Sequence, residues 1–414
     1  MSVIKPFKAV RPAKDLVREV AALPYDVYSS KEARVVVKEN PRSFLAIDRA
    51  ETFFDTSVDI HSEQIYKKAH DVLYAWIEDG TFVQEDKNML YLYELVMNNR
   101  SQIGIVSCTS VNEYLDNKIK KHEKTRADKE ADRINHVDYC DANTGPIFLT
   151  YKSDQRVNTL VESWKTHKKP LYDFVAEDGI THRVWSVDDD TTITSLVEAF
   201  GAIETLYIAD GHHRAASAVK VAQMRRKDNP AYTGEEAFNY FLSVSFPDEQ
   251  LYIMDYNRVV KDLNGLTESE FIEAIKKQFE IIKTSEAPIR PDEKAMFAMI
   301  LEDTWYLLKA KENSYNHLDP VLNLDVSILQ LNLLAPILGI GDPRTDQRID
   351  FVGGIRGLEE LTRRTKVDMK VGFAMYPTSI EELMAIADAD QLMPPKSTWF
   401  EPKLRSGLFI HLLK

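Results

Sequence analysis

The chain has 414 residues and carries 52 Lys and Arg against 65 Asp and Glu, which gives a net charge of −13 at neutral pH. Its 44% hydrophobic and 28% charged residues are typical of a globular protein and exclude a disordered or fibrous chain. The acidic balance argues against broad nucleic-acid binding, which needs a concentrated basic surface. At roughly 150 residues per domain, the length predicts two or three lobes.

Cysteine content and hydropathy predict a cytoplasmic protein without a membrane anchor. The chain has two cysteines, Cys108 and Cys140, which excludes a disulfide framework and a Cys-rich zinc site. The first 15 residues are charged throughout and so do not resemble a signal peptide. No stretch approaches the roughly 18 uninterrupted apolar residues of a membrane span. We therefore expect a reducing compartment and a core large enough to enclose a site.

The periodicity of apolar residues separates helices from strands along the chain. Strands follow one another directly more often than they alternate with helices; residues 90–96 and 102–108, for example, flank the polar turn MNNRS. This order predicts an α+β fold with mixed, mainly antiparallel sheets and peripheral helices, rather than a doubly wound parallel sheet. The predicted helices are residues 63–77, 193–199, 215–226, 267–279, 326–334 and 379–389, and the predicted strands are residues 90–96, 102–108, 181–187, 206–209, 238–246, 251–256, 296–301 and 370–375.

Domain boundaries have no clear marker, because the chain lacks internal repeats and low-complexity linkers. We place them near residues 145 and 247. The predicted lobes are residues 1–145, residues 146–247 and residues 248–414. We also predict that residues 238–246 and 251–256 form an antiparallel pair around the sequence PDEQ.

The segment LYIADGHHRAASA, residues 206–218, predicts a strand that turns directly into a helix. Glycine can adopt the positive φ of such a turn. The unpaired N–H groups and the dipole of the new helix favour an anion, and Arg and His side chains add donors. We therefore predict a phosphate-binding turn with a carboxylate that could hold a divalent metal or accept a proton; the alternative is a helix cap beside incidental polar residues. The junction consists of Asp210, Gly211, His212, His213 and Arg214.

The segment KIKKHEKTR, residues 118–126, concentrates five basic residues around one glutamate in an otherwise acidic chain. Such a local excess of positive charge is suited to phosphate groups. The alternative is a solvated helix face. The residues considered for the site are Glu123, Lys124, Thr125 and Arg126.

Two further segments carry candidate residues. MPPKSTWFEPK, residues 393–403, offers Lys396, Ser397 and Thr398 as a cation and two hydroxyl donors, although such irregular segments also act as latches for a C-terminus. LPYDV places Asp26 in a turn, as a general base, a metal ligand or a residue that stabilises its own turn. Arg258 follows a strand and has no assigned role.

Several common motifs are missing from the sequence. It contains no G-x-x-x-x-G-K-[ST] loop, no G-x-G-x-x-G fingerprint and no G-x-S-x-G or H-E-x-x-H motif. Any nucleotide would therefore bind in an unusual cradle.

The motifs FKAVRP, PYDV, KHEKTR, DGHHRAASA and PPKSTWFEPK occur in this order over nearly the whole chain. This set resembles the bacterial family numbered 1015 among the domains of unknown function. The resemblance implies a cytoplasmic protein, and members are often encoded beside serine-biosynthesis genes.

The DGHHRA turn also resembles the phosphate-binding turn of the ParB and sulfiredoxin-like fold, and the free serine kinases of that fold carry a closely similar turn. This resemblance implies such a core with large additions, ATP or ADP and Mg²⁺ as cofactors, and phosphates on residues 211–214. It places Asp210 near the metal or the substrate and requires an N-terminal carboxylate as base, for which Asp26 competes with Glu123. The catalytic cysteine position of sulfiredoxin is His212 here, which argues against sulfinic-acid repair.

Together these features predict a nucleotide-dependent kinase that phosphorylates an amino-acid hydroxyl, with free L-serine as the favoured substrate. The expected catalytic residues are Asp26, Glu123, Asp210 and His212. Alternatives are a phosphoserine phosphatase or phosphotransferase, a non-catalytic nucleotide-binding regulator, and a metal-only hydrolase. The expected partners are a small amino acid or phosphorylated metabolite and a nucleotide, with neither membrane nor nucleic acid; a homodimer is compatible with the sequence. The metal-only hydrolase would use four histidines that lack a standard spacing for metal ligands: His122, His136, His212 and His213.

Overall fold

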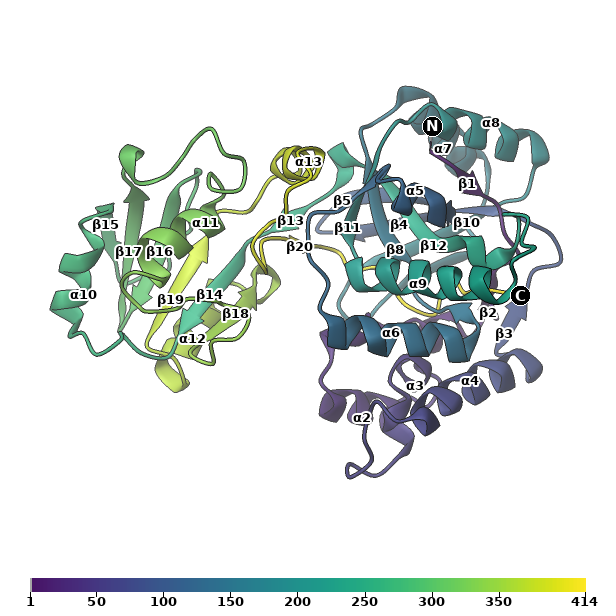
Figure 1. Ribbon diagram of the computed structural model, residues 1–414, viewed down its shortest axis with the longest axis horizontal. Helices are drawn as coiled ribbons and strands as arrows, with labels where there is room; N and C mark the ends of the chain where they lie inside the picture. Colours follow the sequence, from purple (N-terminus) through teal and green to yellow (C-terminus); the bar gives the residue numbers. More distant parts are fainter. Residues whose placement is uncertain (1) are drawn as a thin grey trace. The chain divides into compact units, whose positions relative to one another are not determined.

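The computed structural model describes residues 2–414 and divides into two compact units (Figure 1). The first unit contains the chain up to Leu251 together with Pro402–Lys414, and the second unit is Tyr252–Glu401. The chain therefore leaves the first unit once and returns to it near its end. The division into lobes 1–145, 146–247 and 248–414 stays a prediction. Within residues 2–414, no helix is both long and apolar enough to cross a membrane.

A nine-stranded sheet forms the centre of the first unit. Its strands are β1 (Ile4–Lys5), β4 (Leu90–Met97), β5 (Arg100–Ser110), β6 (Ile119–Lys120), β8 (Ile147–Tyr151), β9 (Tyr172–Val175), β10 (Thr181–Val187), β11 (Leu206–Asp210) and β12 (Tyr240–Pro247). The order is β6-β11-β8-β12-β5-β4-β10-β9, with β1 paired to β5. Two pairs, β11 with β6 and β12 with β8, are parallel and the others are antiparallel. The predicted α+β class with mixed, mainly antiparallel sheets is confirmed.

Local sequence explains the β4–β5 hairpin. The MNNRS turn joins the two strands, and Asn98 and Asn99 both adopt positive φ, 51° and 62°. Asparagine tolerates this conformation better than most residues, and two such residues match the twist of a two-residue hairpin.

Helices cover the sheet and build a second core in the first unit (Figure 1). They are α1 (Val17–Val20), α2 (Ser30–Glu39), α3 (Leu45–Asp48), α4 (Glu63–Glu78), α5 (Val111–Leu115), α6 (Ala127–Cys140), α7 (Gln155–His167), α8 (Asp190–Gly201) and α9 (His212–Asp228). Helix α6 packs between α9 on one side and α4 on the other. Two short strand pairs complete the unit, β2 (Val10–Pro12) with β3 (Phe82–Gln84) and β7 (Ala142–Asn143) with β21 (His411–Leu412). This packing brings α3, α6 and α9 into one region, which contains the site described below.

The second unit is built on a six-stranded antiparallel sheet of order β15-β17-β16-β19-β14-β18. Its strands are β14 (Tyr256–Val260), β15 (Phe279–Ser285), β16 (Met296–Leu301), β17 (Thr304–Ala310), β18 (Ile349–Gly353) and β19 (Val371–Met375), with the separate pair β13 (Ile253–Met254) and β20 (Trp399–Phe400). Its helices are α10 (Glu268–Ile275), α11 (Asp325–Leu329), α12 (Leu358–Val367) and α13 (Ile380–Asp388). A π-helical turn, Gln330–Leu334, continues α11.

The predicted pairing of residues 238–246 with 251–256 is wrong. Strand β12 already has a partner on each side, β5 and β8, so it has no free edge for a third strand. The PDEQ sequence instead forms a 3₁₀ turn, Asp248–Gln250, and β13 pairs with β20.

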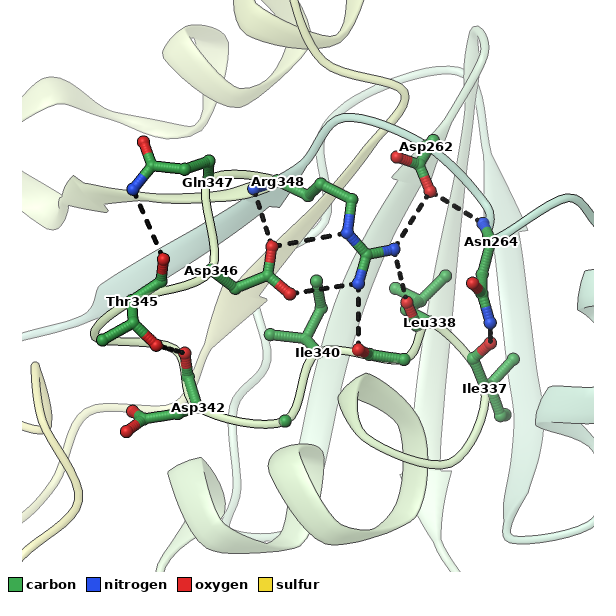
Figure 2. A network of polar contacts seen from close by, with 12 residues as sticks. Asp262, Asn264, Ile337, Leu338, Ile340, Asp342, Thr345, Asp346, Gln347 and Arg348 are labelled. Carbon is green, nitrogen blue, oxygen red and sulfur yellow. Dashed lines mark hydrogen bonds and ion pairs between the residues drawn. The ribbon is translucent and has the colours of Figure 1, made fainter.

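Figure 2 shows a polar network that fixes a loop of the second unit. The Arg348 guanidinium donates to the carbonyl oxygens of Leu338 (3.0 Å) and Gly339 (2.9 Å) and pairs with Asp346 (3.0 Å) and Asp262 (3.4 Å). Because these carbonyls follow the π-helical turn and lack strand partners, the arginine supplies the hydrogen bonds that they would otherwise lose. This network has a structural role.

Candidate functional site

The DGHHR turn has the predicted strand-to-helix geometry. Strand β11 ends at Asp210, and Gly211 adopts φ 93° and ψ 32° directly before the 17-residue helix α9. A Cβ atom at Gly211 would lie 3.0 Å from Nε of Arg214. Only glycine therefore combines this left-handed backbone with the arginine folded over it. The first N–H groups of α9, which have no partner within the helix, lie at this turn. Phosphate binding by the turn stays a prediction.

Asp210 forms an ion pair that sequence reasoning missed. Its carboxylate accepts from the Gly211 N–H at 2.8 Å and contacts Nζ of Lys403 at 3.1 Å. Burial alone would raise the pKa of Asp210, but the positive charges of Lys403 and Arg214 outweigh burial and hold the pKa well below its usual range. Asp210 is therefore ionised at neutral pH.

An ionised Asp210 fits the needs of a Mg²⁺ ligand only in part. Mg²⁺ usually binds one or two carboxylates and completes its shell with phosphate oxygens and water. Across residues 2–414, no group of three or more His, Cys, Asp or Glu side chains is arranged to hold a metal ion. Asp210 could thus hold Mg²⁺ only together with a bound phosphate. The described residues contain no ligand set for a metal-only hydrolase; His136, for example, contacts the carbonyl oxygen of Ile47.

His212 is held between His122 and Glu123. Its ring contacts that of His122 edge-to-face with centroids 4.4 Å apart, and its Nε2 accepts from the His122 N–H at 3.5 Å. This assigns the proton to Nδ1, which lies 3.9 Å from Oε2 of Glu123. Burial and the neighbouring His122 hold the pKa of His212 well below its usual range. His212 is therefore neutral at pH 7, and its Nδ1 lies near Glu123 without a hydrogen bond to it.

His213 connects the turn to the basic segment and to the N-terminal region. Its Nε2 accepts from the Arg126 N–H at 3.0 Å. Burial lowers the pKa of His213, while the negative charges of Asp26 and Glu130 partly offset that effect. Asp26 itself is exposed in a 3₁₀ turn, Tyr25–Val27. Asp26 and Arg126 therefore both lie near His213.

The side chain of Arg214 packs against two glycines, Gly211 in its own turn and Gly145 in another segment. Its Nη1 donates to the carbonyl oxygen of Pro146 at 2.7 Å, and a Cβ at Gly145 would lie 3.5 Å from the same nitrogen. Among the described residues no carboxylate forms an ion pair with Arg214, although its charge acts on Asp210 and on the buried Asp48. Because a neutral carbonyl group holds the Arg214 guanidinium in place, its positive charge remains available to bind an anion.

The basic segment does not form the solvated helix that was the alternative interpretation. Ile119–Lys120 is strand β6 beside β11, and residues 121–126 run irregularly past His212 and His213. Lys124 is exposed, and Thr125 donates to Glu130 at 2.7 Å. A role for both in nucleotide binding stays a prediction.

Lys396, Ser397 and Thr398 lie in the second unit, where the contacts are local. Nζ of Lys396 lies 5.5 Å from the ring centroid of Tyr256, and Arg258 donates to the Lys396 carbonyl oxygen at 2.8 Å. Ser397 donates to the carbonyl oxygen of Pro394 at 2.6 Å. These contacts hold the segment against other residues of the second unit, and they give Arg258 a structural role. Participation of the three residues in the site stays a prediction.

The family model described as "Protein of unknown function (DUF1015)" matches residues 4–327. The chain belongs to this family. The DGHHR turn, the basic segment and Asp26 all lie within the matched part of this DUF1015 chain, whereas Lys403 lies beyond it. No curated protein matches the chain.

Solved structures show a distant likeness to the DUF1015 chain. A mutant free serine kinase in complex with ADP is 14% identical, with a TM-score of 0.35, and the match covers 74% of this chain and 92% of that one. SbnI from Staphylococcus aureus, truncated at its C-terminus, is 13% identical, with a TM-score of 0.39 and coverage of 74% and 87%. A conserved hypothetical protein from Pyrococcus furiosus is 15% identical, with a TM-score of 0.34 and coverage of 75% and 95%.

If the turn binds nucleotide phosphates, as proposed below, we expect Lys403→Met to weaken ADP binding about tenfold, because the ionised Asp210 would then face the phosphates without its cation, and each 1.4 kcal/mol is a factor of ten. Isothermal titration calorimetry with ADP and Mg²⁺ measures the change. Lys220→Met is the control, since Lys220 is an exposed lysine on α9, about two turns beyond the DGHHR turn. Equal affinities of the two variants would contradict a role for Lys403.

Proposed function

We propose that the protein is a nucleotide-dependent kinase that phosphorylates the hydroxyl group of an amino acid, with free L-serine as the favoured substrate. The observation that carries the proposal is the left-handed Gly211 turn, which opens α9 beside an ionised Asp210, Lys403 and Arg214. Phosphoryl transfer requires positioning and charge neutralisation more than covalent chemistry, and this set of groups supplies both.

The residues of the first unit take separate roles in this proposal. The N–H groups at the start of α9, with Arg214 and Lys403, bind the phosphates of ATP or ADP. Mg²⁺, when bound at Asp210, neutralises charge that develops on the transferred phosphoryl group. Asp26, the exposed carboxylate near His213, orients or deprotonates the substrate hydroxyl, and Glu123 is the competing candidate.

The test is incubation of the purified protein with ATP or ADP, Mg²⁺ and L-serine, with O-phosphoserine measured by mass spectrometry. We expect phosphoserine from the wild type and a decrease of at least a hundredfold for Arg214→Ala and for His213→Ala. Lys220→Ala, also on α9, should retain wild-type turnover.

Other outcomes separate the alternatives. An absence of phosphoserine above the Arg214→Ala level would refute the kinase proposal. Release of inorganic phosphate from phosphoserine without nucleotide would instead support the phosphatase direction. Nucleotide binding without turnover of any amino acid would support a regulator.

A further inference from the structure

Two narrow cavities lie beside the DGHHR turn within the first unit and share one wall. Tyr25, Asp48, Arg133 and His136 line both of them. One cavity continues to Arg214 and to residues 143–145, and the other continues between α4 and α6. The shared residues therefore connect the start of α9 with the space between α4 and α6, to which the proposed kinase mechanism assigns no role.

Asp48, at the end of α3, is a buried acid at this wall. It is 4% exposed, accepts from the Thr144 hydroxyl at 3.2 Å and is hydrogen-bonded to the side chain of Ser406. Burial raises the pKa of Asp48, and the charges of Arg133 and Arg214 only partly oppose this rise. When a buried carboxylate carries a negative charge that its neighbours do not fully offset, a cationic group that pairs with it is favoured.

Arg133, on α6, is a buried cation at the same wall. It is 7% exposed and lies 4.1 Å from the centroid of the Tyr25 ring. Its Nε and Nη2 face Asp132, at 2.9 and 2.8 Å, and Tyr66 holds that carboxylate from its other side. Within residues 2–414 no hydrogen bond engages Nη1 of Arg133. One nitrogen of a rigid, oriented guanidinium is thus left for an anionic group.

We infer that these cavities bind the backbone end of an α-amino acid, with its carboxylate on Arg133 and Arg214 and its ammonium group on Asp48. The three side chains come from α3, α6 and α9, so the packing of these helices sets the spacing between the two charges. Arg214 belongs to both the cavity and the DGHHR turn, which directs the amino-acid side chain towards the turn. This inference rests on the proposed function, since it supplies the substrate subsite.

The test is calorimetric titration of the full chain without nucleotide, using four small molecules. L-Serine and L-alanine carry both charged groups, D-glycerate lacks the ammonium group and ethanolamine lacks the carboxylate. We expect L-serine and L-alanine to bind with similar Kd, and the other two to bind at least tenfold more weakly.

Asp48→Asn should weaken L-serine binding at least tenfold while ADP binding, which reports a folded site, stays unchanged. Asp325→Asn is the matched control, because Asp325 is a second buried aspartate with a raised pKa and lies in the other unit. It should bind L-serine like the wild type.

Equal L-serine affinity of Asp48→Asn and the wild type would overturn the inference, as would equal binding of all four molecules or no binding of any. Phosphoserine formation by a protein with such a result would leave the kinase proposal intact. Conversely, Asp48-dependent binding of L-serine and L-alanine without phosphoserine formation would support the subsite and refute the kinase proposal.

Discussion

Gly211→Ala is expected to weaken ADP binding at least tenfold and to abolish phosphoserine formation. A left-handed backbone costs a non-glycine residue about 1–2 kcal/mol. More importantly, the new methyl group would lie 3.0 Å from Nε and 3.1 Å from Nη2 of Arg214, so the guanidinium would have to shift by a few tenths of an ångström. A shift of this positioned arginine weakens its charge-assisted contact to phosphate, which depends on geometry. Titration calorimetry with ADP and the phosphoserine assay measure the two effects.

Gly234 provides a control in the same unit for this variant. Its φ is 96°, nearly that of Gly211, but a Cβ there would meet no atom within 4 Å. Gly234→Ala therefore introduces the same backbone strain without displacing a side chain. We expect it to lower the melting temperature about as much as Gly211→Ala and to bind ADP like the wild type. If both variants lose ADP binding equally, general destabilisation rather than displacement of Arg214 explains the loss.

The DGHHR turn could be predicted from sequence because its parts are consecutive. Strand, glycine, histidines and arginine follow one another in the chain, so local rules for turns and helix starts are sufficient to place them. The charge of residues 118–126 indicated a suitability for phosphate, but the approach of residues 122–126 to His212 and His213 could not be derived from the sequence. Its actual form, an irregular segment after β6, depends on the pairing of β6 with β11 and could not be derived from periodicity.

Lys403, Asp48 and Arg133 could not be found in this way, because their roles depend on contacts across the chain. Lys403 is 193 positions from Asp210 and follows the return of the chain from the second unit. Asp48 and Arg133 occupy helices whose polar residues are usually solvated, and the sequence does not reveal that both are buried. The only available signal for Lys403 was its place in PPKSTWFEPK, where Lys396 was preferred.

In the fold as well, individual strands could be predicted from neighbouring residues, whereas the pairing of strands far apart in the sequence could not. Residues 181–187 and 296–301 form strands with the predicted bounds, because partial alternation indicates the first strand and a short continuous apolar run indicates the second. The partners of β12 were predicted wrongly because proximity in sequence favoured a hairpin, whereas β8 reaches β12 as a parallel neighbour from nearly 100 residues away. Strand pairing depends on tertiary packing, which a single sequence does not supply.

Asp325→Asn is expected to stabilise the second unit at pH 8 and to change its stability little at pH 4. Asp325 is 6% exposed; one carboxyl oxygen accepts from the Ala295 N–H at 3.0 Å, and the other has no partner among the described residues. Burial, together with the negative charge of Glu382, raises the pKa of Asp325 from 3.8 to about 7, and the hydrogen bond from the Ala295 N–H and the charge of Lys294 only partly oppose this rise.

The direction of the pH dependence follows from proton binding. Between pH 4 and 7 the folded state retains a proton on Asp325 that the unfolded state has lost, so the free energy of unfolding falls as the pH rises. The penalty is absent below pH 3.8 and complete above pH 7, where it amounts to at most about 4 kcal/mol. Asparagine keeps the acceptor for Ala295 and carries no charge, so the variant should lose this pH dependence.

Hydrogen exchange in peptides from β16 and β17, corrected for intrinsic exchange rates, measures the free energy of unfolding of the second unit alone. Asp48→Asn, which changes a buried aspartate of the first unit, should leave exchange in these peptides unaltered at both pH values. If wild type and Asp325→Asn lose stability equally between pH 4 and 8, Asp325 is not the group that titrates. If only the wild type loses stability, Asp325 is the buried acid whose ionisation weakens the second unit at neutral pH.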